Sequence, residues 1–124
     1  MRVSKSLLDI EKAVIGTILC DDGSFGYMDA CSVSLKKELF MDRKNAFIFG
    51  LLEELHKGGS VSTTQLDVWI YADEHNIKYG DVGNFVVYMN ELSAFYSLRD
   101  MESFKRNVRE LVKRYISQKR NGTR

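Results

Sequence analysis

Apolar residues recur along this chain at the three- and four-residue spacing of an amphipathic helix. The first such face consists of Leu7, Leu8, Val14, Ile15, Ile18 and Leu19. This spacing predicts a helix over residues 7–19, with Ser6 as its N-cap and Asp9 in its first turn. Strand-like alternation is scarce, and the sequence contains no proline. The pattern therefore predicts an all-α domain.

A short helix and a longer one are expected next. Residues 21–24 have the composition of a turn, and Ser24 can begin a helix over residues 25–31. The longer helix follows Asp42, a suitable N-cap, and ends at the glycine pair 58–59. Its inward stripe is expected to consist of Phe47, Ile48, Leu51, Leu52 and Leu55.

Two further helices are expected between the glycine pair and residue 96. Thr63 or Thr64 begins the first, which runs to about Asn76. We expect its bulky apolar residues to face the core, namely Leu66, Trp69 and Ile70. The second helix carries an apolar stripe that consists of Phe85, Tyr88, Met89 and Leu92.

The last helical segment has a narrower apolar pattern than the others. Its residues are spaced three, four, three and four apart, and they form what we name the C-terminal stripe: Met101, Phe104, Val108, Leu111 and Tyr115. Such spacing is typical of a helix that packs along a partner helix. We therefore expect the C-terminal stripe to be a self-association or partner interface.

Basic side chains surround the C-terminal stripe. We name them the C-terminal basic set: Lys105, Arg106, Arg109, Lys113 and Arg114. The formal net charge of the chain is only +1, but residues 99–124 hold nine basic and three acidic side chains. This face could contact nucleic acid or a partner protein, although a solvated helix face is the commoner reason for such a pattern.

Length and composition indicate one compact domain. The 124 residues are 44% hydrophobic and 28% charged, which is ordinary for a folded domain. Within it we expect a helical globular head at 1–96 and a long basic helix at 97–124, the first arm of a helical hairpin. No apolar run suits a membrane span or a signal peptide, so no membrane association and a cytoplasmic location are expected.

The sequence offers no catalytic or metal-binding motif. It lacks the glycine-rich loops and the lysine that cradle nucleotide phosphates. Cys20 and Cys31 are expected to be free thiols, and His56 and His75 are far apart in sequence. We therefore expect this chain to have no enzymatic activity, no metal and no cofactor.

Glu11 is unusual because it lies beside the apolar stripe of the first helix, where a solvated face would not place a carboxylate. We expect it to be partly buried. An internal salt bridge or a hydrogen bond from a loop N–H group is favoured over contact with a partner.

Several motifs occur in an order that carries a family resemblance. They are residues 9–16 of the first helix, Phe40, Ile48-Phe49, Leu55 with Gly58-Gly59, Val61, Leu66, Val82-Gly83, Tyr88, Glu91-Leu92, Phe104 and Val108-Arg109. Over roughly residues 6–115 the chain resembles the N-terminal domain of DnaB-type replicative helicases. It departs from the family pattern in having no proline before Phe40, Ser62 in place of an Asp, and a one-residue offset near residues 84–87.

The resemblance implies a helical globule followed by a helical hairpin. In the family, hairpins pair the domains into dimers, and three dimers form the collar of a hexamer that faces primase and loader proteins. ATP hydrolysis belongs to a separate C-terminal motor, whose phosphate loop is not in this sequence. Only one hairpin arm is present before residue 124, so dimerisation through a complete hairpin is not expected of this chain.

Our interpretation is a scaffold and partner-docking domain of a replicative DNA helicase, acting in the primosome. It would support dimer or hexamer assembly and bind primase or a helicase loader, with at most weak DNA contact. One alternative is a stand-alone phage or plasmid protein of the same fold that regulates a helicase or primase. Another is a small basic nucleic-acid-binding module, for which affinity would fall steeply with added salt.

Overall fold

The computed structural model describes residues 2–19, 26–58, 65–75, 77, 85–94 and 101–122, and these contain helices but no strand. The elements are α1 (Arg2–Leu19), α2 (Gly26–Ala30), the 3-10 helix η1 (Lys37–Leu39), α3 (Arg43–Lys57), α4 (Gln65–Glu74), α5 (Phe85–Ala94) and α6 (Met101–Gly122). The predicted all-α fold is confirmed. None of the described helices is long and apolar enough to cross a bilayer.

The structure confirms one of the predicted helix caps and differs from the prediction at two other helix ends. The Asp42 carboxylate accepts hydrogen bonds from the backbone N–H groups of Lys44, at 2.8 Å, and Asn45, at 3.2 Å. The predicted N-cap of α3 is therefore confirmed. Ser6 is not an N-cap, because α1 begins four residues earlier. The expected caps Ser24, Thr63 and Thr64 lie outside the described residues, and α4 ends at Glu74, before the expected Asn76.

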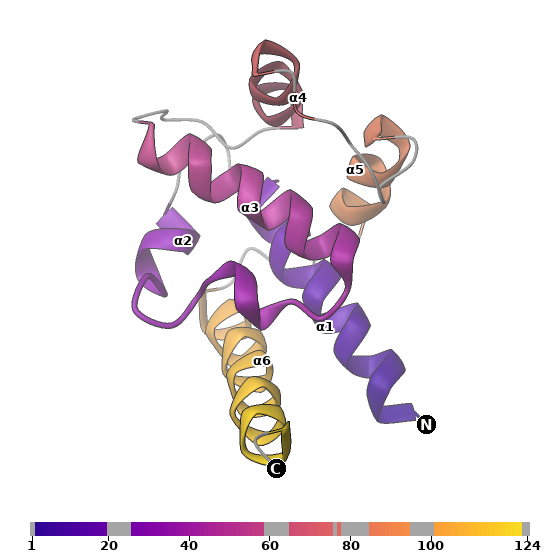
Figure 1. The fold of residues 1–124 in the computed structure, drawn as a ribbon, viewed down its shortest axis with the longest axis vertical. Helices are drawn as coiled ribbons and strands as arrows, with labels where there is room; N and C mark the ends of the chain where they lie inside the picture. Colours follow the sequence, from indigo (N-terminus) through magenta and orange to yellow (C-terminus); the bar gives the residue numbers. More distant parts are fainter. Residues whose placement is uncertain are drawn as a thin grey trace.

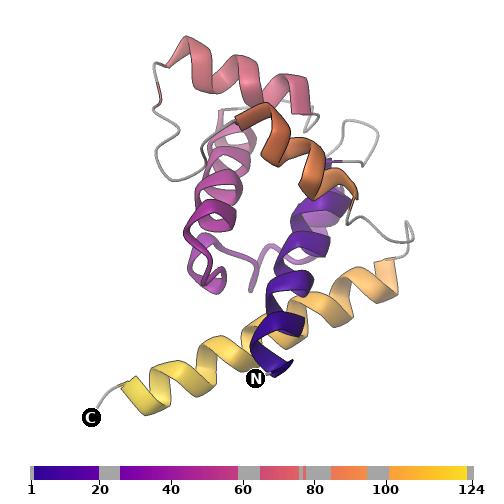
Figure 2. The same ribbon diagram turned by 90° about the vertical axis from the view of Figure 1, so that its right-hand side faces the viewer.

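The core forms where α1 packs against α6, α5 and α3. Its fully buried side chains include Ile15 and Ile18 from α1, Ile48 and Leu52 from α3, and Leu92 from α5. In Figures 1 and 2, α6 is a long rod that crosses α1 at one end of the molecule, while α4 lies at the other end. Aromatic contacts join α2 to α6 and η1 to α3, since the Tyr27 and Phe104 rings lie 4.9 Å apart and Phe40 stacks on Phe49 at 5.0 Å.

Helix α4 faces the core with its small side chains and not with its large ones. Val68 and Ala72 are buried, whereas Leu66, Trp69 and Ile70 are 63%, 39% and 38% exposed. The expectation that these three residues face inward is therefore wrong. The reason is the helical phase, because Val68 and Ala72 are four residues apart and share the side that meets α3 and α5. The bulky residues lie on the opposite side.

The C-terminal stripe also differs from its expected role. Phe104, Val108 and Leu111 are at most 2% exposed, and they pack into the core of their own chain, where α6 meets α1. Met101 and Tyr115 are partly buried at the edge of that core. In this structure the helix that the stripe packs along is α1 of the same chain. An intermolecular role for the stripe stays a prediction.

Candidate functional site

A buried polar cluster joins the two ends of the chain. Glu11 is 0% exposed, and its carboxylate accepts the backbone N–H of Met41 at 2.7 Å and the Asn45 side-chain amide at 2.9 Å. The same carboxylate forms an ion pair with Arg114 of α6, which also donates to the Leu39 carbonyl oxygen at 2.8 Å. We expected partial burial with an internal salt bridge or a hydrogen bond from a loop N–H group; the structure contains both contacts, and the burial is complete.

The polar cluster extends to α5 through Tyr88. Its hydroxyl donates a hydrogen bond to the side-chain oxygen of Asn45. Burial raises the pKa of the Tyr88 hydroxyl, and the charges of Asp42, Glu91 and Glu11 raise it further. Tyr88 therefore remains a neutral hydrogen-bond donor. The contacts of this cluster connect α1, α3, α5 and α6.

The C-terminal basic set is divided by the structure. Arg106 and Arg109 are exposed, and Lys105 is half-buried. Lys113 is 74% exposed at its side chain, where it forms an ion pair with Glu110 at 3.4 Å. Arg114 is only 11% exposed at its side chain, because it pairs with Glu11. The Arg114 side chain is thus mostly engaged inside the domain, and contact of the C-terminal basic set with nucleic acid or a partner stays a prediction.

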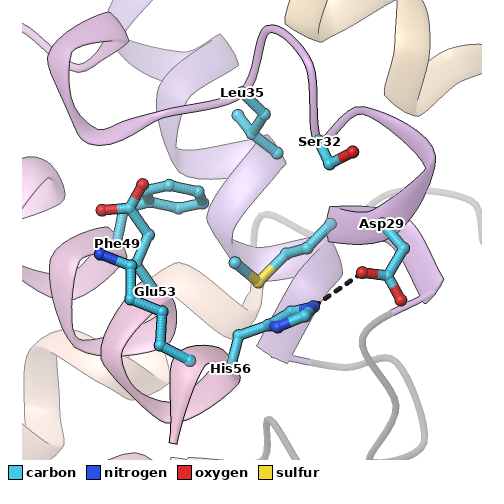
Figure 3. A pocket seen from close by; sticks show the side chains of 8 residues that line it. Asp29, Ser32, Leu35, Phe49, Glu53 and His56 are labelled. Carbon is cyan, nitrogen blue, oxygen red and sulfur yellow. Dashed lines mark hydrogen bonds and ion pairs between the residues drawn. The ribbon is translucent and has the colours of Figure 1, made fainter.

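A cavity of about 230 Å³ opens between α2, the segment after it and α3. Its apolar floor is formed by the buried side chains of Met28, Leu35 and Phe49. Figure 3 shows Leu35 and Phe49 of this floor together with polar side chains that also line the cavity. The rim consists of Asp29, Ser32, Glu53, His56 and Lys57.

The rim of the cavity holds charged groups in fixed positions. His56 Nε2 lies 2.7 Å from Asp29 Oδ1, and this contact connects α3 to α2 (Figure 3). Burial raises the pKa of the Glu53 carboxyl; the charge of Glu38 adds to this, while the Lys37 N–H and the charges of Lys57 and Lys37 oppose it. Among the described residues, no group of three His, Cys, Asp or Glu side chains is arranged to hold a metal ion. The apolar floor and charged rim therefore suit binding of an apolar group.

Sequence reasoning did not find this cavity. It identified both helices that form the walls and noted His56 near the end of α3. However, Met28 and Phe49 belong to segments about twenty residues apart. A periodic pattern predicts each helix separately and does not predict a space between two of them. The only local signal was the polar end of α3, which is ordinary for a helix C-terminus.

Comparison with known proteins identifies the class of this fold. An all-α domain with a central first helix and a long basic last helix matches a sequence model named DnaB-like helicase N terminal domain, over residues 3–110. Because the match covers most of the chain, this protein belongs to the DnaB-like helicase N-terminal domain family. Searches of curated proteins and of solved structures gave no significant match.

Proposed function

We propose that this chain is a scaffold and partner-docking domain of a replicative DNA helicase, which supports assembly of the helicase and binds primase or a loader. Membership of the DnaB-like N-terminal domain family supports the connection to replication. The sequence has no phosphate-binding loop, so the contribution of this chain is binding and not nucleotide hydrolysis.

The observation that carries the docking role is the cavity between α2 and α3. Pockets for small molecules and cofactors occupy about 300–1,000 Å³, and this cavity, at about 230 Å³, is smaller. It has room for one large apolar side chain. Interfaces commonly depend on such an anchor seated in a desolvated pocket, with charged groups at the rim that set orientation. The occupant we propose is an aliphatic or aromatic side chain of primase or the loader.

Filling the cavity tests this function. Ser32 lines the cavity and is exposed, so Ser32→Phe would place a ring where the anchor enters. The matched control is Val33→Phe, because Val33 is 97% exposed and does not line the cavity. Calorimetry should measure binding of the chain to the primase and the loader encoded by the same genome. For Ser32→Phe the affinity should fall about tenfold or more, equivalent to about 1.4 kcal/mol, and for the control it should change little.

Two outcomes would contradict the proposal in different ways. If neither protein binds the wild-type chain, the docking function is wrong. If one of them binds the wild type and Ser32→Phe equally well, docking occurs elsewhere on the domain and the cavity is not the anchor site.

A further inference from the structure

Helix α4 carries an apolar stripe that stays partly exposed. Leu66, Trp69, Ile70 and Asp73 recur at spacings of three and four, so they share one side of the helix, and we name them the α4 stripe. Its three apolar members are all more than one third exposed. Scattered exposed apolar residues are normal in proteins, but three large ones on a single ten-residue helix mark a contact surface.

The α4 stripe lies in an acidic setting. Helix α4 contains Asp67, Asp73 and Glu74 and no lysine or arginine. Asp73 and Glu74 are both exposed. A partner that covers this stripe should therefore combine an apolar side chain with several positive charges.

Helix α6 of the same protein has such a surface. Ile116 is 49% exposed and lies on the side of α6 that faces away from the buried stripe. Arg109, Lys113 and Arg120 share this side at seven, three and four residues from Ile116, and Lys119 flanks it. All four basic side chains are exposed. We name these five residues the α6 outer face.

The two complementary surfaces lie at opposite ends of the molecule. Figures 1 and 2 both place α4 at one end of the long axis and the C-terminal end of α6 at the other. The two surfaces cannot meet within one chain. We propose that copies of this protein associate head to tail, with the α4 stripe of one copy covering the α6 outer face of the next.

This contact joins two different surfaces, so each copy keeps one unused surface of each kind. Such heterologous association produces a closed ring if the rotation between copies closes, and an open chain if it does not. The proposal deepens the assembly role in the proposed function, and it needs neither primase nor loader. It also differs from pairing through the C-terminal stripe, whose inner residues are buried.

A pair of complementary variants tests the arrangement. Leu66→Lys damages the α4 stripe and leaves the α6 outer face intact, whereas Ile116→Glu does the reverse. Light scattering and sedimentation of the wild-type chain should give masses that rise with protein concentration and fall with added salt. Each variant alone should associate at least about tenfold more weakly. A mixture of the two should form a 1:1 dimer and nothing larger, because only one intact pair of surfaces remains.

The controls separate this contact from other effects. Val33→Lys adds a charge at a fully exposed site away from both surfaces and should leave association unchanged. Thermal melting should show that both test variants remain folded, and their affinity for primase or loader should equal that of the wild type. In the wild type, emission of Trp69, the single tryptophan, should shift to shorter wavelength on association.

Three results would overturn the proposal. A wild-type chain that stays monomeric at every concentration would mean that another protein covers the α4 stripe. If a variant associates as well as the wild type, the surface that carries its substitution is not part of the contact. Folded variants that remain monomeric when mixed would exclude an α4-to-α6 contact, whatever the result of the partner-binding experiment.

Discussion

Glu11 is a charged residue placed where most proteins put an apolar one. It is fully buried, and its carboxylate connects α1 with the segment before α3, with α3 itself and with α6. A buried ion pair is costly to form, but removal of one member leaves the other charge without compensation. The position of Glu11 beside an apolar stripe predicted its burial. Its partner Arg114 was not predictable, because 103 residues separate the two in sequence.

At the residue scale we predict that Glu11→Ala strongly destabilises the domain. It would leave Arg114 as an unpaired, mostly buried cation and deprive Met41 N–H of its acceptor, at a cost of about 3–5 kcal/mol. The matched control is Glu110→Ala, since Glu110 pairs with Lys113 at 3.4 Å and the two side chains are 44% and 74% exposed. Surface pairs contribute about 0–1 kcal/mol. If urea unfolding shows that both variants lose the same free energy of unfolding, the distinction between the buried and the exposed ion pair is wrong.

At the scale of elements, periodicity located the helices better than it assigned their faces. The apolar period predicted α1, α3, α4, α5 and α6, because burial of one side imposes that period, but it did not predict the short η1. It failed for α4, where apolar residues occupy two opposite sides and the larger ones face outward. It also could not state whether the partner of α6 was α1 or a second chain, since both give the same three-four spacing.

At the scale of elements we predict that a charge at Leu111 destabilises the packing of α6. Leu111 is 0% exposed in the core around α1 and α6, so Leu111→Asp would lose an apolar contact and bury a carboxylate. We expect that variant to lose its cooperative thermal transition, since cavity formation alone costs about 2–5 kcal/mol. Ile116→Asp, five residues later at a site that is 49% exposed, should melt close to the wild type. A folded, monomeric Leu111→Asp protein would restore the C-terminal stripe as an interface.

At the scale of the whole molecule, the head at 1–96 and the helix at 97–124 share one core. Phe104 of α6 contacts Tyr27 of α2, and Val108 is buried in the same cluster as residues of α1 and α3. Composition predicted a single domain, and the division into a head and a C-terminal arm stays a prediction. The cavity between α2 and α3 could not be foreseen, because it depends on how two helices lie in space and not on either pattern.

We predict that the two ends of the molecule unfold together. Trp69 on α4 reports one end by fluorescence, and far-UV circular dichroism reports all helices, including the long α6. With a continuous core, both signals should follow a single transition with the same midpoint. Loss of α6 helicity at a lower denaturant concentration than the Trp69 transition would show that residues 97–124 form an independent unit.

The pairing of the first helix with the last also has a consequence for synthesis on the ribosome. Glu11 emerges early, but its cation Arg114 is translated 103 residues later. Until α6 leaves the exit tunnel, the Glu11 carboxylate lacks its cation and α1 lacks the apolar side chains that α6 supplies to the core. Folding of this domain should therefore be completed only after α6 has emerged, by contacts of large sequence separation that form slowly. A nascent chain arrested before residue 101 should remain sensitive to protease and should bind chaperones.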